Sequence, residues 1–396
     1  MKKKGGNLKR VKRQNRSLIK EMIYKNRLIT RTEIAERLSL TLPTVTTTVN
    51  QMLEEGILVE KPISDWNGEL GRRPVALDFN EKQMYFVGVE LKPFDTAICI
   101  IDLTGAVIVQ EKFEVASAVY SEMKQMLLQQ IEETIRISKV NRQAIKGIGI
   151  GLSGLIQHEI GYIYRNIHSD WQENYLGKEI MEEIGIRTVI ENNVRVRAVA
   201  TELKGGIDQQ KEIPENFAYF FVSAGIACSL VIKDSVYTGY QAGAGELGHT
   251  VIIPDGPICK VCGNRGCLDA VAGERVILEE YQKILLARTG KKEPDITIKD
   301  VIQDFRNHDR QTRELLYLRV KYLAIALANI INYVSPQTVY VDGYIFQEDE
   351  LRRRILEETR FNLYGKEKTE ILFVPYDSFG GAKAAAFFAV KHIFIQ

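Results

Sequence analysis

Residues 246–267 read ELGHTVIIPDGPICKVCGNRGC, and this stretch holds three of the chain's five cysteines together with one histidine. The four side chains are those of His249, Cys259, Cys262 and Cys267. Three cysteines and a histidine form a common ligand set of closed, tetrahedral structural zinc sites. Buried free cysteines are the simpler interpretation, because cysteine is often found in protein cores. The Gly-Asn-Arg-Gly run between the last two cysteines can turn sharply, however, and the clustering favours a structural Zn²⁺ with no position open for catalysis.

The composition bounds the class of protein. The chain has 396 residues, of which 45% are hydrophobic, and a formal net charge of +2, as is ordinary for a globular protein of two or three domains. No apolar run reaches the length of a membrane span, and the N-terminus lacks the apolar segment of a secretory signal. With three cysteines assigned to a metal, the other two provide no disulfide framework. We therefore expect a cytoplasmic protein that does not insert into membranes.

Positive charge is concentrated at one end of the chain. Residues 1–30 carry eleven Lys and Arg side chains against the single acid Glu21. Lys12 and Arg13 belong to this basic arm, which we expect to precede the first helix. Such an arm would attract DNA phosphates without regard to base sequence.

Residues 1–80 contain the signals of three short helices and two strands. We expect helices over residues 15–26, 32–38 and from about Pro43 to Gly56, followed by strands at 57–60 and 75–78. Thr30 and Glu33 have the spacing of a capping box that starts the second helix. The apolar residues expected to face inward are Leu18, Ile19, Met22 and Ile23 in the first helix and Val45, Val49, Met52 and Leu53 in the third.

This pattern is typical of a winged helix-turn-helix domain. The third helix would present short polar side chains to the major groove of DNA, and a wing at residues 71–74 would offer two guanidinium groups to phosphates or to the minor groove. The residues are Thr44, Thr46, Thr47 and Asn50 in the helix, and Arg72 and Arg73 in the wing. A helical protein–protein module with solvated threonines is the alternative, but the basic arm and the basic wing favour DNA.

After Asn80, short apolar strands alternate with helical stretches, which indicates an α/β fold. Two strand-rich halves suggest a duplicated, two-lobed body with a cleft between the lobes. The expected strands lie at 85–89, 96–101, 145–152, 188–190, 217–223, 229–232, 339–341 and 371–374. The expected helices lie near 121–138, 271–287, 311–334 and 347–363. The third of these helices is either a core helix or a candidate surface for dimerisation.

Five motifs in this order resemble the ROK family, which joins sugar kinases and sugar-responsive repressors. They are GIGIGLSGLI (147–156), IENN (190–193), GELGH (245–249), CGNRGC (262–267) and NIINYVSPQTVYVDG (329–343). The helix-turn-helix with its GRRP wing resembles the repressor branch, particularly the xylose-repressor type of Gram-positive bacteria. The resemblance covers essentially the whole chain and implies an actin-like, sugar-kinase ATPase fold in which zinc braces the sugar-side loops.

The resemblance also divides the chain into domains. Residues 1–80 would form the winged helix-turn-helix domain with its basic arm, and residues 81–396 the sugar-sensing ROK domain. Within the latter, lobe 1 would span about 81–196 together with a C-terminal helix at 380–396. Lobe 2 would span about 197–379 and contain the zinc site.

The sequence departs from the family's kinases in both phosphate loops and at the catalytic base. The first phosphate loop, of Asp-Gly-Gly-Thr type in the kinases, is here Glu90-Leu-Lys-Pro-Phe-Asp-Thr96, and the second is Ser223-Ala-Gly-Ile-Ala-Cys228. Without those glycines the backbone cannot approach phosphate oxygens closely. The catalytic Asp of the family is replaced by Asn193, whose amide cannot act as a general base. We therefore predict that the protein is not an enzyme.

The sugar side of the family's site is better preserved. The resemblance implies that Glu246 accepts hydrogen bonds from two sugar hydroxyls and that His249 ligates zinc with one ring nitrogen while facing the sugar with the other. Asp269 stands where the family usually has Glu, so its reach is shorter. The remaining expected sugar contacts are Asn192, Asn193, Asn166 and Ser169, of which Asn192 and Ser169 could instead only satisfy backbone groups.

Two further features concern histidine and cysteine. The family usually has Cys-x-Cys where Cys259 and Cys262 are separated by two residues, so the loop must bulge locally for both to bind zinc. The other histidines have no comparable neighbours in the sequence, and we expect them to be ordinary core or surface residues. They are His158, His168, His308 and His392.

We therefore expect a sugar-responsive repressor of carbohydrate utilisation genes, with xylose-type sugars as candidate effectors. It would bind an inverted-repeat operator as a homodimer or a dimer of dimers, with one winged helix in each half-site. Two alternatives are a DNA-binding regulator controlled by a protein partner, and an ATP-dependent sugar kinase with an incidental N-terminal domain. The kinase would need the phosphate loop and the Asp that this chain lacks.

Overall fold

The computed structural model describes residues 8–62, 75–81, 84–92, 95–115, 119–166, 171, 173–207, 213–365 and 368–396. The chain divides into two compact units. The first ends at Ile213 and also includes Phe379–Gln396, and the second spans Pro214–Ser378.

The sequence predicts the lobe boundary near residue 196, but helix α6 (Asn193–Ile207) belongs wholly to the first unit because it packs on α12 (Gly380–Ala389). No helix in the described ranges is long and apolar enough to cross a membrane.

The N-terminal head contains the predicted three helices and two-stranded wing. They are α1 (Leu8–Lys25), α2 (Arg31–Leu38), α3 (Leu42–Glu54), β1 (Leu58–Pro62) and β2 (Val75–Phe79), and the two strands pair antiparallel. The capping box is confirmed, since Thr30 N donates to Glu33 Oε2 at 2.8 Å and Glu33 N to Thr30 Oγ1 at 3.3 Å. Val45, Val49 and Met52 of α3 are fully buried, as their spacing predicted.

Two details of α1 correct the sequence prediction. The helix begins at Leu8, so Lys12 and Arg13 are exposed residues of α1 itself and not of an arm ahead of it. Lys and Arg are good helix formers, and no Gly or Pro interrupts residues 8–14. The inward face is also rotated. Ile19, Ile23 and Tyr24 are fully buried, Met22 is half-buried, and Leu18 is exposed.

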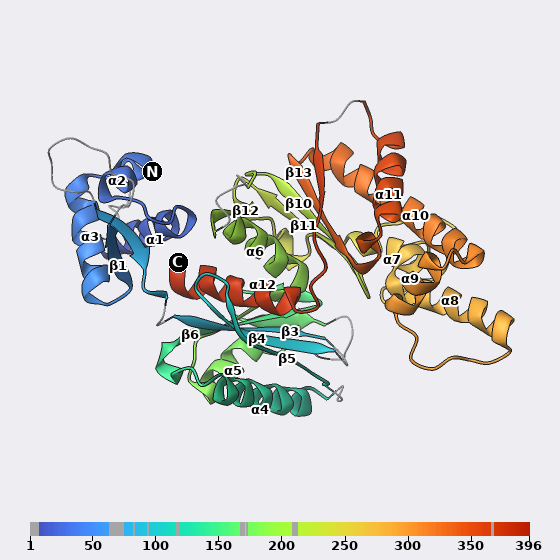
Figure 1. The fold of residues 1–396 in the computed structure, drawn as a ribbon, viewed down its shortest axis with the longest axis horizontal. Helices are drawn as coiled ribbons and strands as arrows, with labels where there is room; N and C mark the ends of the chain where they lie inside the picture. Colours follow the sequence, from blue (N-terminus) through green and yellow to red (C-terminus); the bar gives the residue numbers. More distant parts are fainter. Residues whose placement is uncertain are drawn as a thin grey trace. The chain divides into compact units, whose positions relative to one another are not determined.

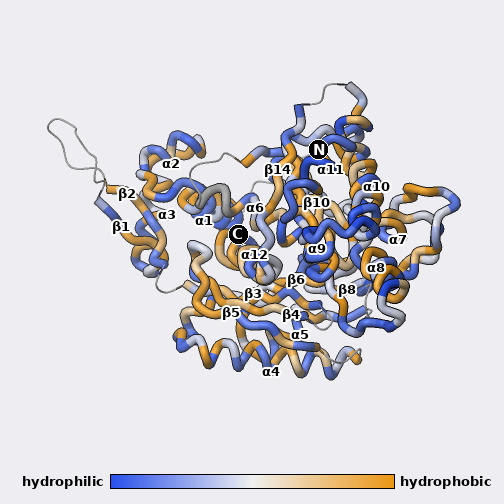
Figure 2. Tube along the Cα trace, turned by 45° about the vertical axis from the view of Figure 1, so that its right-hand side comes forward, coloured by the Kyte–Doolittle hydropathy of each residue, from blue (hydrophilic) through white to orange (hydrophobic). Residues whose placement is uncertain are grey.

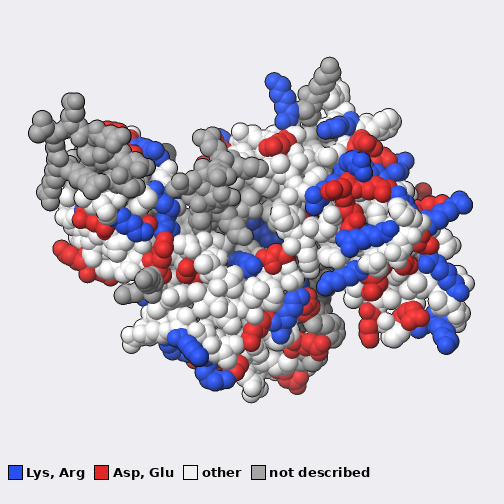
Figure 3. Space-filling view, viewed as in Figure 1, with Lys and Arg blue, Asp and Glu red and all other residues white. Residues whose placement is uncertain are grey.

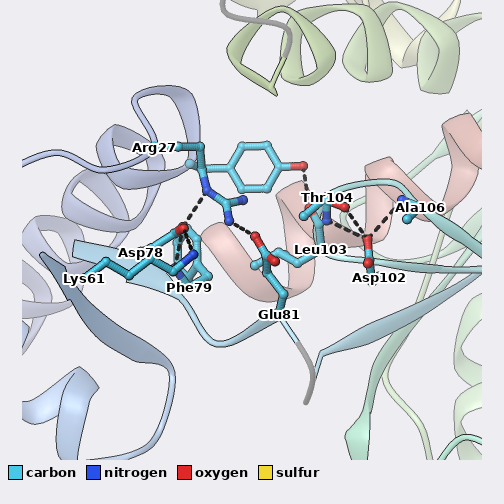
Figure 4. Close-up of polar contacts among 10 residues, drawn as sticks. Arg27, Lys61, Asp78, Phe79, Glu81, Asp102, Leu103, Thr104 and Ala106 are labelled. Carbon is cyan, nitrogen blue, oxygen red and sulfur yellow. Dashed lines mark hydrogen bonds and ion pairs between the residues drawn. The ribbon is translucent and has the colours of Figure 1, made fainter. Parts of the chain in front are cut away.

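A network of charged side chains holds the end of α1 against the two strands of the head, next to the body of the first unit (Figure 4). Arg27, in the turn after α1, forms ion pairs with Asp78 at 2.5 Å and with Glu81. Lys61 of β1 also reaches Asp78, with a Nζ–Oδ2 distance of 2.6 Å. Nearby, the hydroxyl of Tyr24 donates to the backbone oxygen of Leu103 at 3.2 Å. Arg27 and Asp78, at the centre of this network, are largely shielded from water, and the Tyr24 hydrogen bond connects the head to the body.

Asp78→Asn should destabilise this junction by about 2 to 3 kcal/mol at pH 7, since Arg27 and Lys61 lose their shared carboxylate. Burial alone would raise the pKa of Asp78, but hydrogen bonds from Arg27 and Lys61 lower it overall. A lowered folded-state pKa adds stability that is present above the unfolded value of about 3.9 and is lost as pH falls through the folded value. Melting temperatures of both proteins between pH 7 and pH 3 test this.

The difference between the wild type and Asp78→Asn should shrink at the acid end of that range. Glu60→Gln is the matched control, because Glu60 pairs with Arg31 at 2.7 Å but is 44% exposed. An exposed pair contributes at most about 1 kcal/mol. Equal melting temperatures for Asp78→Asn and Glu60→Gln would contradict the anchoring role.

The first unit is built on one sheet, whose described strands run in the order β5-β4-β3-β6-β9. They are β3 (Tyr85–Leu91), β4 (Thr96–Asp102), β5 (Val107–Phe113), β6 (Ile145–Leu152) and β9 (Thr188–Asn192), with a small hairpin of β7 (Leu155–Gln157) and β8 (Tyr162–Arg165) beside it. β3, β4 and β5 are antiparallel neighbours, whereas β6 and β9 run parallel to β3. Helices α4 (Tyr120–Ser138) and α5 (Leu176–Ile184) cover one face, and α12 covers the other (Figure 1).

The amphipathic pattern that predicted α4 is visible as alternating hydrophobic and hydrophilic segments along its tube (Figure 2). Its buried side includes Met123, Leu127 and Ile131. The sequence did not predict β5, because this edge strand has alternating exposed positions and carries little apolar signal.

The glycines of GIGIGLSGLI are explained by the close approach of α12 to the sheet. A Cβ on Gly149 would lie 1.8 Å from the backbone oxygen of Ala385, and one on Gly147 would lie 2.5 Å from the side chain of Ile393. On the neighbouring strand, a Cβ on Gly88 would meet the backbone oxygen of Ala382 at 2.0 Å. Only glycine permits this packing, which holds α12 tightly against β3 and β6.

The second unit repeats the topology of the first. Its described strands run in the order β12-β11-β10-β13-β14, with the same succession of antiparallel and parallel pairs, so the predicted duplication is confirmed. They are β10 (Phe217–Val222), β11 (Ile226–Ile232), β12 (Ser235–Val236), β13 (Thr338–Gly343) and β14 (Glu370–Phe373). The helices are α7 (Leu268–Ala272), α8 (Glu274–Thr289), α9 (Ile298–Arg306), α10 (Arg310–Val334) and α11 (Asp349–Phe361). α10 is a core helix, since its apolar positions from Leu315 to Ile331 lie in the main hydrophobic cluster of this unit.

Candidate functional site

The four predicted metal ligands lie together in the second unit. The ligand atoms of His249, Cys259, Cys262 and Cys267 are all within 4.8 Å of one another. The Sγ atoms of Cys262 and Cys267 are 3.5 Å apart, and Sγ of Cys259 is 3.7 Å from Nδ1 of His249. In a tetrahedral zinc site with the usual bond lengths, sulfur–sulfur and sulfur–nitrogen separations are about 3.8 and 3.6 Å. The cluster could therefore bind a metal ion.

The loop places these ligands through tight backbone turns. The N–H of Gly263 donates to the oxygen of Cys259 at 2.9 Å, and the N–H of Cys259 donates to the oxygen of Asn264 at 2.7 Å. This five-residue turn accommodates the extra residue between the first two cysteines. Gly266 has a φ of +71°, and a Cβ there would lie 1.5 Å from the backbone oxygen of Ile253. A glycine is thus required for Cys267 to face the other ligands.

The GELGH motif and Asp269 lie side by side in the second unit. Glu246 and His249 flank a short 3-10 turn at Leu247–His249, and both are half-buried. Oδ1 of Asp269 accepts a hydrogen bond from the N–H of Ile226 at 2.7 Å, and a Cβ on Gly248 would lie 2.5 Å from the same oxygen. Burial raises the pKa of Asp269, although the Ile226 N–H, His249 and Arg275 oppose this. The hydrogen bond between Asp269 and Ile226 thus connects α7 to β11.

In the first unit, Asn192 and Asn166 lie around Gly154. The side-chain amide of Asn192 donates to the oxygen of Gly154 at 3.0 Å, and its Oδ1 accepts from the N–H of Val194 at 2.9 Å. Asn192 therefore caps α6 and braces the strand ends, as the alternative interpretation of this residue proposed. A Cβ on Gly154 would lie 3.0 Å from the Cα of Asn166, which is buried. Asn193 is half-buried at the start of α6, and Ser169 lies outside the described residues.

The segment that replaces the kinase phosphate loop is filled by the chain's own charges. Glu90 is 2% exposed and forms an ion pair with Arg197 of α6 at 2.5 Å. Lys92 lies 3.3 Å from the same carboxylate. The positive charges of Arg197 and Lys92 are therefore already partnered by Glu90.

The segment predicted to replace the second phosphate loop, Ser223–Cys228, forms the turn after β10 and the first three residues of β11. The N–H of Ser223 donates to the oxygen of Gly225 at 3.1 Å, and the oxygen of Ser223 accepts from the N–H of Glu274 at 3.2 Å. These backbone groups are therefore used inside the protein.

The head presents part of the predicted DNA-binding set on the outer side of α3. Thr47 and Asn50 are exposed, whereas Thr44 and Thr46 are half-buried. The hydroxyls of Thr44 and Thr41 are 2.8 Å apart, and Asn50 Oδ1 accepts from Arg31 at 3.3 Å. The wing residues Arg72 and Arg73 lie outside the described residues.

Acidic and basic side chains alternate over α10 and α11 on the face drawn in Figure 3. Many of them form ion pairs, such as Arg313–Glu350 and Arg306–Glu348. This face offers no single-sign patch for a polyanion.

Sequence reasoning missed a histidine pair in the first unit. His158, in the β7–β8 turn, lies 3.2 Å from the buried Glu191, and its ring centroid is 5.1 Å from that of His392. The ring of Phe388 packs against both histidines. His158 and His392 are therefore not the ordinary, unconnected residues that we expected. No local signal could have revealed the pair, because its members come from distant parts of the sequence.

Comparisons with known proteins agree with these features. A model described as the ROK family matches residues 86–389, and one described as winged helix-turn-helix DNA-binding matches residues 14–59. The xylose repressor of Bacillus subtilis is 29% identical over 337 residues, covering 85% of this chain and 84% of that protein. The DNA-binding transcriptional dual regulator NagC of Escherichia coli is 24% identical over 348 residues, covering 87% and 84%.

Solved structures confirm the predicted fold class. A ROK family transcriptional regulator, described as a homolog of the E. coli MLC protein, superposes with a TM-score of 0.82 at 22% identity and covers 97% of this chain and 98% of its own. A ROK hexokinase from Thermus thermophilus superposes with a TM-score of 0.60 at 23% identity, covering 77% and 97%. Since the matching family model spans most of the chain, the protein belongs to the ROK family and joins its sugar-kinase fold to an N-terminal winged helix-turn-helix.

Proposed function

We propose that the protein is a sugar-responsive transcriptional repressor without kinase activity. The observation that carries this proposal is the pairing of a winged helix-turn-helix head with a ROK body in which Glu90 is buried against Arg197. Asn193 adds to it, since an amide at this position cannot accept the proton of a sugar hydroxyl. A coupled assay with ATP and a panel of hexoses and xylose should give no turnover. Measurable phosphorylation would overturn this part of the proposal.

The DNA partner we propose is an inverted-repeat operator bound by a homodimer or a dimer of dimers, in the cytoplasm. Repressors named for xylose and N-acetylglucosamine among the relatives support a sugar as the effector. Glu246 and His249 are the residues that we propose to bind its hydroxyls. Asn192, Asn193, Asn166 and Ser169 remain predicted sugar contacts, and Asp269 is a weaker one because its Oδ1 already holds Ile226.

The metal we propose is a structural Zn²⁺ held by His249, Cys259, Cys262 and Cys267. Nδ1 is the ring nitrogen of His249 that points to Cys259, which leaves Nε2 for a sugar hydroxyl. Zinc would thus fix the ring orientation of a sugar-binding residue, and its contribution would be to bracing and not to catalysis.

Glu246→Ala should leave operator affinity unchanged within about twofold and abolish the response to sugar. The carboxylate is acceptor-only and would take hydrogen bonds from two hydroxyls, so its loss should weaken sugar binding by about 3 kcal/mol or more. Calorimetry with xylose, glucose and N-acetylglucosamine, and operator binding with and without the sugar that gives heat, measure both effects.

Glu279→Ala is the control, because Glu279 is an exposed carboxylate of the same unit that pairs with Lys260. A normal sugar response in Glu246→Ala would remove this residue from the pocket. If the wild type gives no heat with any of the three sugars, control by a protein partner is favoured instead.

A further inference from the structure

A chain of contacts links the end of β9 to the first helix of the DNA-binding head, all within the first unit. Glu191, which precedes Asn192, has one carboxylate oxygen 3.3 Å from Arg195 and the other 3.2 Å from Nδ1 of His158. It is 2% exposed, so neither contact is screened by water. Glu191, which is adjacent to the predicted sugar contact Asn192, thus contacts the histidine pair through His158.

The second half of the chain of contacts runs through the C-terminal segment, Val390–Gln396. His392 lies within this segment, and its ring centroid is 4.2 Å from that of Phe388. The backbone oxygen of Gln396 accepts from the hydroxyl of Ser17 in α1 at 2.9 Å. The backbone oxygen of Phe394 accepts from Nζ of Lys20 at 2.6 Å, and this ammonium also lies 4.8 Å from the ring centroid of Phe394.

The C-terminal segment has an uncommon conformation and is packed on the sheet. Residues Val390–Ile395 form a π-helical turn at the end of α12, and π-helical turns are rare and frequently lie at functional sites. α12 is held against the sheet by the contacts of Gly88 and Gly149, and the segment is held by the contact of Ile393 with Gly147. A change at β9 can therefore reach α1 through the side chains of this packed segment.

The pKa values of the two histidines are shifted in opposite directions. Burial, His158 and Lys391 lower the pKa of His392 to about 3, so His392 is neutral. Burial alone would lower the pKa of His158, but the carboxylate of Glu191 raises it overall. Glu191 thus favours the cationic form of His158, whereas His392 on the C-terminal segment is neutral.

We propose that His158 and His392 transmit the effector signal from Glu191 to helix α1 and so set the orientation of the DNA-binding head. This inference rests on the proposed sugar-responsive function and adds the path by which the effector signal reaches α1. The effector changes the affinity for DNA only if it binds two arrangements of the protein with different affinities. The histidines can therefore carry this coupling without contributing to sugar binding alone or to DNA binding alone.

The test is the coupling factor, defined as the ratio of operator Kd values with and without saturating xylose. In the wild type we expect a factor of about 10 or more, within the usual range for allosteric coupling. His158→Phe keeps the ring packing on Phe388 but loses Glu191, and His392→Phe keeps the packing on Phe388 but loses the ring nitrogens. Both variants should lower the factor to less than about 2, while the operator Kd without sugar and the sugar Kd without operator each stay within about threefold of the wild type.

Three more variants make the outcome decisive. Ser17→Ala removes the contact of α1 with Gln396 at a half-buried position with a small side chain, and it should also reduce coupling. His158→Gln retains a donor for Glu191 and should restore part of the coupling, whereas Glu182→Gln, on α5 and 61% exposed, should leave it unchanged. Full coupling in His158→Phe, His392→Phe and Ser17→Ala overturns the proposed route. A wild type that binds operator without responding to xylose, glucose or N-acetylglucosamine overturns the proposed function and the route with it.

Discussion

Cys262→Ser should release the metal and lower the melting temperature of the protein by about 10 °C. Cys262 is exposed, unlike the buried Cys259 and Cys267, so a serine there costs no core packing. What it removes is one of four ligands, and a hydroxyl is a poor substitute for a thiolate on zinc. The Sγ of Cys267, 3.5 Å from that of Cys262, would also lose its partner in the cluster. The loss of stability would then report the bracing role of the metal.

Metal emission spectroscopy and calorimetry on the purified chain measure the two effects. Lys260→Ala is the matched control, because Lys260 lies between the two ligands but points to the exposed Glu279. It should keep one zinc per chain and melt within about 2 °C of the wild type, as expected for an exposed ion pair. A Cys262→Ser protein that retains a full equivalent of zinc would show that the cluster is not the metal site.

The parts of this molecule that the sequence predicted best are those whose signals are local. The capping box of Thr30 and Glu33 and the buried spacing of Val45 and Val49 each lie within one helical element, and the structure contains both. The four predicted metal ligands lie close in sequence as well, and the turn around Gly263 brings them together. In these cases neighbouring residues decide the geometry.

The parts that were missed depend on distant segments or on competing tendencies. His158 and His392 meet only because the β7–β8 hairpin and the end of α12 flank the same strands. The arm containing Lys12 and Arg13 was read from its charge, but the helix-forming tendency of Lys and Arg extends α1 through it. The sequence predicts Asp269 as a sugar contact whose side chain is shorter than that of Glu. Its hydrogen bond from the N–H of Ile226 depends on strand β11, which is distant from Asp269 in the sequence.

The combined variant Thr47→Ala, Asn50→Ala should lose about 100-fold or more in affinity for the operator. Both residues are exposed on the outer side of α3, the helix expected to enter the major groove. An Asn can contact adenine with two hydrogen bonds, and each good base contact adds about 1 to 3 kcal/mol of discrimination. The loss should fall on specific binding, since neither side chain is charged. Affinity for unrelated DNA and its salt dependence should stay unchanged.

Thr48→Ala is the matched control, because it is the same chemical change on the same helix at a half-buried position. Its hydroxyl donates to the backbone oxygen of Thr44 at 2.9 Å, so it is used within α3. Fluorescence anisotropy with operator and scrambled duplexes, at two salt concentrations, separates the specific from the nonspecific component. If Thr48→Ala and the combined variant lose equal affinity, α3 contributes stability to the head and some other surface reads the bases. If only the combined variant loses the operator and both bind scrambled DNA alike, α3 is the reading helix.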